Sequence, residues 1–313
     1  MSNEFCDAVS RMTTLQQKLA AGRFVITAEI TPPVSFDRAD LIAKAAPLKG
    51  LADAVNVTDG AGARPHMGAL PAAAILVQEG IEPILQLTCR DRNRIALQSE
   101  LMGAAASGVD NLLILRGDDP SAGDQPDAKP VFDLDARQLL ETARRLRDGH
   151  ELPSGRKVAG AAQFLLGAAD SPVDPPAGWE PKGLAAKVAA GAQFAQTQFC
   201  MDAGIVARYM ARLAEHGLAD KLKVIIGIAP LRSAKSARWM KDKLYGTIIP
   251  DSIVERLDKA ADPAAEGRAI AVDLIGDLAA LPGVAGVHIM APNNDEAVPD
   301  VIRAARAGIK RLA

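Results

Sequence analysis

The feature that most constrains the fold is a regular alternation of short apolar segments with helix-like segments. Eight segments are predicted as strands from their apolar and β-branched content: residues 24–30, 52–58, 82–88, 111–115, 157–163, 194–198, 223–228 and 286–290. Alternation of this kind is typical of a parallel sheet. Eight units over about 290 residues match the count and the size of a (β/α)₈ barrel. We therefore predict an α/β protein, a (β/α)₈ TIM barrel, as a single domain over residues 1–313.

The helix-like segments support this order. They cover residues 10–22, 37–49, 67–79, 92–107, 135–147, 181–190, 203–215, 233–242, 250–260, 263–280 and 295–311. The first of them is predicted as a leading helix ahead of the barrel. The alternative fold is an open doubly wound sheet, but no Gly-x-Gly-x-x-Gly follows the first strand.

Composition excludes several classes of protein. The chain is 49% hydrophobic but only 4% aromatic, and its formal net charge is -2, so neither nucleic-acid nor membrane-surface binding is indicated. No segment approaches the roughly 18 apolar residues of a membrane span, and Glu4 and Asp7 argue against a signal peptide. Cys6, Cys89 and Cys200 are odd in number and form no CxxC pair, so no disulfide framework or zinc site is predicted. A cytoplasmic location is expected.

One stretch combines a buried strand with a polar end. Residues 111–115 are followed at once by Arg116, Gly117, Asp118, Asp119 and Pro120. In parallel α/β folds, ligands bind at the C-terminal ends of the strands. Taken alone, this stretch is more typical of a solvated turn after a core strand. The functional interpretation gains weight because several other predicted strands end in the same way.

In a closed barrel these strand ends would meet at one mouth. They would bring together polar side chains from six strands, namely Glu29, Thr58, Gln86, Asp118, Gln198 and Asn293. Glu29 is unusual because it is a carboxyl inside an apolar strand. The histidines are scattered and have no metal-ligand spacing, so no metal site is predicted. Carboxyls, amides and a hydroxyl at one mouth favour proton transfer to a bound heterocycle, with help for a redox cofactor.

Six motifs carry a resemblance to a known family. They are Ala28-Glu29-x-x-Pro32-Pro33, Val57-Thr58-x-Gly60-Ala61, Leu87-Thr88-Cys89, Leu115-Arg116-Gly117-Asp118, Leu184-x-x-Lys187-Val188-x-x-Gly191-Ala192 and Thr197-Gln198-Phe199-x-x-Asp202. In order and spacing the chain resembles the methylenetetrahydrofolate reductases over nearly its whole length. Each motif alone is weak, but six in order make a specific signal.

The resemblance implies a TIM barrel that reduces 5,10-methylenetetrahydrofolate to 5-methyltetrahydrofolate, with a flavin (FAD or FMN) and NADH or NADPH as electron donor. It implies catalytic roles for Glu29, as general acid, and for Asp118. It implies that Gln198, Thr58 and Asp118 bind the tetrahydrofolate substrate. The cofactor-binding positions that it implies are Thr58, Gln86, Leu115, Arg116, Gly117, Asp118, Glu180 and Lys187.

The chain departs from the family pattern at several contacts. Gln86 stands where a histidine is usual, and Asp59, Ala234 and Asn294 replace a tyrosine, a phenylalanine and an arginine. The family's Tyr-Pro-Glu motif after the fifth strand is placed opposite residues 163–167. A flavin-free form therefore stays open. Two alternative functions also stay open: a folate-binding subunit that receives electrons through a partner protein, and a pterin-binding methyltransferase barrel. A homo-oligomer is a further open arrangement.

Overall fold

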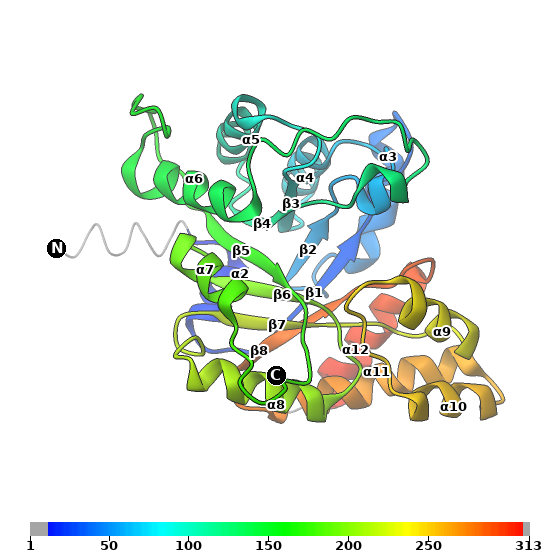
Figure 1. Cartoon of the computed structure of the whole chain (residues 1–313). Helices are drawn as coiled ribbons and strands as arrows, with labels where there is room; N and C mark the ends of the chain where they lie inside the picture. The colour runs from blue at the N-terminus through cyan, green and yellow to red at the C-terminus, as the bar shows by residue number, and fades with distance from the viewer. Residues whose placement is uncertain (1–11, 309–313) are drawn as a thin grey trace.

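Eight parallel strands form a closed barrel in the order of the chain, which confirms the predicted fold. The computed structural model describes residues 12–308. The strands are β1 (Val25–Ile30), β2 (Ala54–Val57), β3 (Pro83–Thr88), β4 (Asn111–Leu115), β5 (Leu165–Asp170), β6 (Phe194–Phe199), β7 (Lys223–Ile228) and β8 (Val284–Ile289). Figure 1 shows the strands at the centre, with helices above and below them.

The helices follow the strands as the alternation predicts. They are α2 (Thr14–Ala20), α3 (Arg38–Ala45), α4 (Ala69–Gln78), α5 (Arg94–Ala106), α6 (Ala136–Gly149), α7 (Lys182–Ala190), α8 (Ala203–Glu215), α9 (Ala234–Lys243), α10 (Asp251–Lys259), α11 (Pro263–Ala280) and α12 (Val298–Gly308). The predicted first and last helices extend to residues 10–11 and 309–311, which lie outside the described residues, as does Cys6.

Local sequence explains where several helices begin. Asp135 caps α6 by accepting a hydrogen bond from the backbone N–H of Gln138, whose side-chain oxygen in turn accepts one from the backbone N–H of Asp135. Asp202 caps α8 through the backbone N–H of Ile205, at 2.9 Å. Such caps satisfy backbone donors that have no partner inside the helix. They hold the helices directly after loops that border the barrel mouth.

The predicted fifth strand is wrong. Residues 157–163 form loop and turn, with Gly160 at φ +84°, and Lys157 makes only an isolated antiparallel bridge to Glu151. The strand instead spans Leu165–Asp170 and pairs with β4 and β6. Gly167 in this strand is required by packing, because a Cβ there would lie 2.2 Å from the ring of Phe194. Small residues in both segments made them hard to distinguish by pattern. The segment that follows β5 therefore begins at Ser171, whereas the sequence analysis placed it at about residues 163–167.

Helix α2 packs against one end of the barrel interior. Its Leu15 and Leu19 are buried in a cluster with inward-facing residues of the strands, among them Val25 of β1. The backbone N–H groups of Thr14 and Leu15 donate to the carboxylate of Glu82, at 2.8 and 2.9 Å. An anion at a helix N-terminus is favourable. The strands begin at this end, so α2 leaves the opposite, C-terminal mouth free for a site.

Candidate active site at the barrel mouth

Glu29 lies near the C-terminal end of β1, and two side chains contact one of its oxygens. Gln86 of β3 donates a hydrogen bond from Nε2 to Oε2 of Glu29 at 2.7 Å. His288 of β8 places Nε2 at 3.6 Å from the same oxygen. The Glu29 side chain is 22% exposed, whereas that of His288 is 3% exposed. A carboxyl is therefore held at the mouth by groups that come from deeper in the barrel.

Beneath Glu29 lies a buried polar layer. Thr27, Asn56, Gln196 and His288 are all less than 4% exposed. Asn56 donates to Oε1 of Gln196 at 2.6 Å, and Gln196 donates to Asn56 and to Thr27 at 3.0 Å each. The Thr27 hydroxyl lies 3.0 Å from Nδ1 of His288. Buried polar groups are costly unless paired, and these are paired with one another.

Sequence reasoning missed most of this layer. It assigned no metal-ligand role to His288, and it did not select Thr27, Asn56 or Gln196. A signal was present, because side chains two residues apart on a strand face the same side. Thr27 and Gln196 each lie two residues before a selected mouth residue, Glu29 and Gln198 respectively.

Thr58 lies directly after β2 and is 2% exposed. Its hydroxyl lies 3.5 Å from Nε2 of His66, which accepts a hydrogen bond from the backbone of Gly60 at 2.9 Å. Nδ1 of His66 lies 2.7 Å from the carbonyl oxygen of Met67. His66 thus organises the loop after β2 and was not selected from the sequence.

The end of β4 places its selected residues on an exposed turn. Asp118 is exposed, and its Oδ2 accepts a hydrogen bond from the backbone of Gly62 at 2.9 Å. The Arg116 guanidinium stacks over the Phe132 ring at 4.4 Å, and Leu115 is partly buried. Gly117 has φ +91°, and a Cβ there would lie 3.0–3.1 Å from Arg90 and Thr88. The glycine therefore serves the turn and its close packing.

Gln198, near the end of β6, is directed toward neighbouring backbone. Its Nε2 donates to the carbonyl of Tyr245 at 3.2 Å, and its Oε1 accepts from the N–H of Phe199 at 3.0 Å. The side chain is partly exposed at the mouth. A ligand that hydrogen-bonds Gln198 would have to replace one of these two contacts.

Lys187 and Glu180 do not join the groups around Glu29. Lys187 donates from Nζ to the carbonyl of Ala169 at 2.6 Å and lies beside Asp170. Glu180 is exposed and pairs with Lys182 at 3.5 Å. Asp170 accepts a hydrogen bond from the hydroxyl of Tyr209 in α8, so it faces the helix layer. Burial raises the pKa of Asp170, while Tyr209 and Lys187 act in the opposite direction.

Asp59 forms a largely buried ion pair near the mouth. It pairs with Arg92, and the two side chains are 11% and 19% exposed. The same carboxylate accepts hydrogen bonds of 2.8 Å from the backbone and the hydroxyl of Thr88. Asp59 thus ties the loop after β2 to the end of β3.

Two hollows border the mouth. One, of about 270 Å³, lies among the loops after β2, β3 and β4 and includes His66 and Arg90. The other, of about 540 Å³, lies between the loops after β7 and β8 and is lined mostly by apolar groups, with Arg232, Lys235 and Trp239 at its edge. Asn294 joins these two loops by donating to the carbonyl of Pro230 at 2.8 Å. We call the second hollow the β7–β8 groove.

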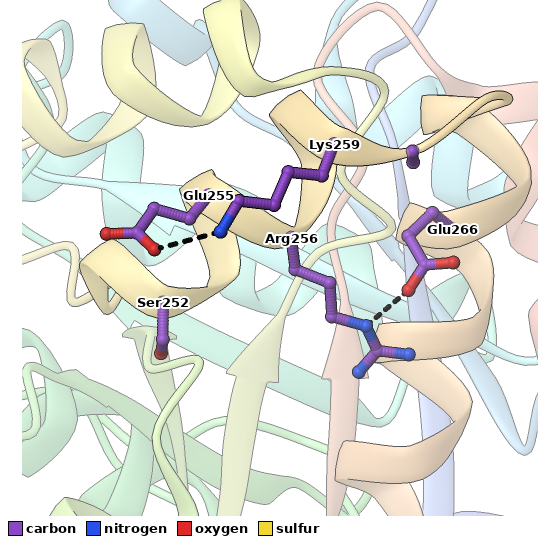
Figure 2. A pocket seen from close by; sticks show the side chains of 6 residues that line it. Ser252, Glu255, Arg256, Lys259 and Glu266 are labelled. Atoms are coloured by element: carbon purple, nitrogen blue, oxygen red, sulfur yellow. Dashed lines mark hydrogen bonds and ion pairs between the residues drawn. The ribbon is translucent and has the colours of Figure 1, made fainter.

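A further hollow lies in the outer helix layer, between α10 and α11 (Figure 2). Its charged side chains are paired with each other, Arg256 with Glu266 and Lys259 with Glu255. It contains none of the mouth residues. We therefore do not assign it to the site.

Within residues 12–308, no group of three or more His, Cys, Asp or Glu side chains could hold a metal ion. In the same part of the chain, no helix combines the length and the apolar character needed to cross a membrane.

Fold and site together define the class: a (β/α)₈ barrel with a carboxyl group held at its C-terminal mouth. The chain belongs to the methylenetetrahydrofolate reductase family, whose profile matches residues 14–306. A Caenorhabditis elegans protein named probable methylenetetrahydrofolate reductase (NADPH) is 24% identical over 258 residues, 76% of this chain. Methylenetetrahydrofolate reductase 2 of Schizosaccharomyces pombe is 27% identical over 204 residues, 63% of this chain.

The chain spans about a third of these curated relatives, since the matches cover 36% and 31% of their lengths. Among solved structures, a Clostridium thermocellum protein described as binding two copies of 5-methyl-5,6,7,8-tetrahydrofolic acid has a TM-score of 0.62 at 15% identity, covering 94% of this chain and 98% of that one. EDTA monooxygenase from Chelativorans has a TM-score of 0.53 at 13% identity, covering 90% and 92%. These two structures support the fold.

Proposed function

We propose that this chain interconverts 5,10-methylenetetrahydrofolate and 5-methyltetrahydrofolate, with NADH or NADPH as the redox partner and Glu29 as general acid. Membership of the methylenetetrahydrofolate reductase family supports the reaction class. The observation that carries the proposal is the contact of Glu29 with Gln86 and His288 at the mouth. These contacts position the Glu29 carboxyl at the end of the barrel where enzymes of this fold bind their substrates.

The proton transfer follows from this placement. Opening the five-membered ring of methylenetetrahydrofolate breaks the bond between the methylene carbon and N10, and N10 must gain a proton. Glu29 in its protonated form would supply that proton, while the donor supplies hydride to the methylene carbon. In the opposite direction Glu29 would take the proton back. A positioned acid of this kind contributes roughly 10²- to 10⁴-fold in rate.

The residues expected to hold a flavin do not form one cradle. Gln86 is committed to Glu29, Arg116 is stacked on Phe132, and Lys187 bonds a backbone carbonyl beside Asp170. The side of Gly117 where a Cβ would stand is packed against Arg90 and Thr88. The described side chains thus do not fit a flavin as the resemblance implies, and no step of the proposed reaction depends on one. A visible absorption spectrum of the purified protein tests whether a flavin binds.

The β7–β8 groove has the chemistry of the remaining part of a folate. A folate carries an aminobenzoyl ring and one or more glutamate carboxylates beyond the pterin. The groove offers apolar walls, the half-exposed indole of Trp239, and Arg232 and Lys235, neither of which forms an ion pair among residues 12–308. We assign the aminobenzoyl-glutamate tail to this groove, with the pterin directed toward Glu29.

The alternative is a folate-binding subunit that exchanges electrons only through a partner protein. The poor fit to a flavin favours it, as does the folate binding described for the Clostridium thermocellum neighbour. The third hypothesis, a pterin-binding methyltransferase, gains no specific support from the contacts at the mouth.

The deciding experiment is an assay of the purified protein in both directions, with methylenetetrahydrofolate plus NADH or NADPH, and with 5-methyltetrahydrofolate plus an electron acceptor. The proposal predicts turnover in at least one direction. Tight binding of 5-methyltetrahydrofolate without turnover in either direction would favour the partner-subunit alternative. Absence of both binding and turnover would refute a folate function altogether.

A further inference from the structure

We propose that His288 is a positioning residue. Together with Gln86 it directs N–H groups at Oε2 of Glu29, so that the acidic proton is carried by Oε1. This inference rests on the proposed function, and it names groups that would act on the acid and not on the substrate. Gln86 and His288 reach Glu29 from β3 and β8, so the carboxyl of β1 is approached from two sides of the barrel.

The first observation is that both contacts fall on one oxygen. Gln86 Nε2 lies 2.7 Å and His288 Nε2 lies 3.6 Å from Oε2 of Glu29. Among residues 12–308, no hydrogen bond is formed by Oε1. An oxygen that accepts N–H groups acts as the carbonyl-type oxygen of a protonated carboxyl, so the proton resides on the other oxygen. The separation of 3.6 Å is longer than a hydrogen bond, and such catalytic contacts often shorten when substrate binds.

The second observation concerns which nitrogen of His288 carries its proton. Asn56 and Gln196 exchange two hydrogen bonds, and Nε2 of Gln196 lies on the side of Thr27 and His288. Gln196 Nε2 then donates to Thr27 Oγ1 at 3.0 Å and lies 3.3 Å from Nδ1 of His288. The Thr27 hydroxyl accepts from Gln196 and has two acceptors within reach for its own hydrogen, Nδ1 of His288 at 3.0 Å and the carbonyl of Val287 at 3.4 Å, of which Nδ1 is the nearer. Nδ1 is thus an acceptor, and neutral His288 carries its proton on Nε2, toward Glu29.

The chemistry of the acid follows from this arrangement. When the O–H bond at Oε1 breaks, the proton moves to N10 of the folate and the electron pair stays on the carboxylate. Gln86 already donates to Oε2 at 2.7 Å, and once the 3.6 Å separation from His288 shortens, both N–H groups stabilise that carboxylate. In the reverse direction the same donors keep Oε2 occupied, so the returning proton binds Oε1.

Three variants separate this role from a purely structural one. His288→Asn keeps an amide near the Nδ1 position, so it retains the contact with Thr27 and loses the donor toward Glu29. His288→Gln is longer and places an N–H near the Nε2 position. Gln86→Met removes the other donor from a different strand. Thermal unfolding of each variant reports whether it is folded.

We expect His288→Asn to lower kcat for the folate reaction by roughly tenfold to a hundredfold, part of the full effect of a general acid. The dissociation constant for 5-methyltetrahydrofolate, measured by calorimetry, should change less than about threefold, because the donor acts on Glu29 and not on the ligand. His288→Gln should recover most of the lost kcat, and Gln86→Met should lower kcat as His288→Asn does. Equal losses in the two His288 variants, or a loss confined to folate binding, would overturn the proposal.

A second measurement is independent of activity. In protein labelled with ¹⁵N-histidine, long-range ¹H–¹⁵N spectra identify the protonated nitrogen of each ring, and the His288→Asn spectrum assigns the His288 signals. We expect the proton of His288 on Nε2; a proton on Nδ1 would overturn the assignment. A wild-type protein that binds folate and is inactive in both directions would refute the proposed function, whereas the spectrum would still decide the tautomer.

Discussion

Gln86 and Glu29 are joined by a hydrogen bond of 2.7 Å that runs from the third strand to the first. Strand β2 lies between these two strands, so the bond passes over the interior of the barrel and not along the sheet. It occupies a side chain that the resemblance assigned to a cofactor. The same bond therefore supports Glu29 as a positioned acid and weakens the case for a flavin beside it.

The first prediction concerns Glu29. Glu29→Gln keeps the size of the side chain and removes the acid, so we expect the folate reaction to fall roughly 10²- to 10⁴-fold. Binding of 5-methyltetrahydrofolate should persist. Asp119→Asn is the matched control, because Asp119 is exposed and only caps the turn at Ser121. Steady-state rates of the three proteins check this, and full activity in Glu29→Gln would rule out Glu29 as the acid.

The second prediction concerns the flavin. Because Gln86, Arg116 and Lys187 are occupied by protein partners, we expect the purified protein to retain little FAD or FMN after gel filtration. The absorption spectrum in the visible range measures this directly, before and after incubation with each flavin. One equivalent of flavin retained through gel filtration would instead support the cofactor that the family resemblance implies.

The third prediction concerns the β7–β8 groove. Replacing both Arg232 and Lys235 by alanine removes two cations from its edge, and we expect folate binding to weaken by about tenfold. The loss should be smaller for a pteroate without glutamate, since that ligand lacks the carboxylates. Lys221→Ala is the control, because Lys221 is exposed just before β7, at the opposite end of the barrel. An equal loss of affinity for both ligands would refute the assignment of the aminobenzoyl-glutamate tail to this groove.

The fourth prediction concerns the pH dependence of stability. Burial raises the pKa of Asp170, so its contribution is fully present below the unfolded-state pKa, about 4, and is lost as pH rises through the folded-state pKa. Relative to Asp170→Asn, the wild-type free energy of unfolding should therefore decline as pH rises above about 4. Urea unfolding at a series of pH values measures this difference.

Asp174 gives the opposite control for that experiment. The Arg208 guanidinium lowers the pKa of Asp174, so its contribution is present above the unfolded-state pKa and is lost as pH falls through the folded-state pKa. The wild-type minus Asp174→Asn difference should accordingly rise with pH. Slopes of the same sign for the two variants would contradict the burial-based explanation for Asp170.

The fifth prediction concerns the packing of α11 on the loop after β7. A Cβ at Gly267 would lie 1.7 Å from the carbonyl oxygen of Leu231, a backbone atom that cannot move alone. We expect Gly267→Ala to lower the free energy of unfolding by about 2–4 kcal/mol. At Gly183 in α7 no atom lies within 4 Å of the added Cβ, so Gly183→Ala should be neutral or stabilising by up to about 1 kcal/mol. Chemical denaturation of both variants distinguishes the two sites.

The sequence by itself determined the alternation and most element positions, because periodicity, caps and turn residues are local signals. Strand β7, at Lys223–Ile228, and helices α8 and α11 lie where the sequence places them. The position of Glu29 at a strand end followed from the same local pattern. The strand predicted at residues 157–163 was wrong because the small residues of this segment suit a strand as well as a loop.

Tertiary structure alone decided which side chains meet. Gln86 is 57 residues from Glu29 along the chain, and the contact exists only because the strands close into a barrel. The ring of Thr27, Asn56, Gln196 and His288 likewise depends on strand register. Asp170 faces α8, and Lys187, although it belongs to one of the six motifs, faces the end of β5. Local pattern fixes each residue's element and face, but distances between elements depend on closure and register, which no single segment encodes.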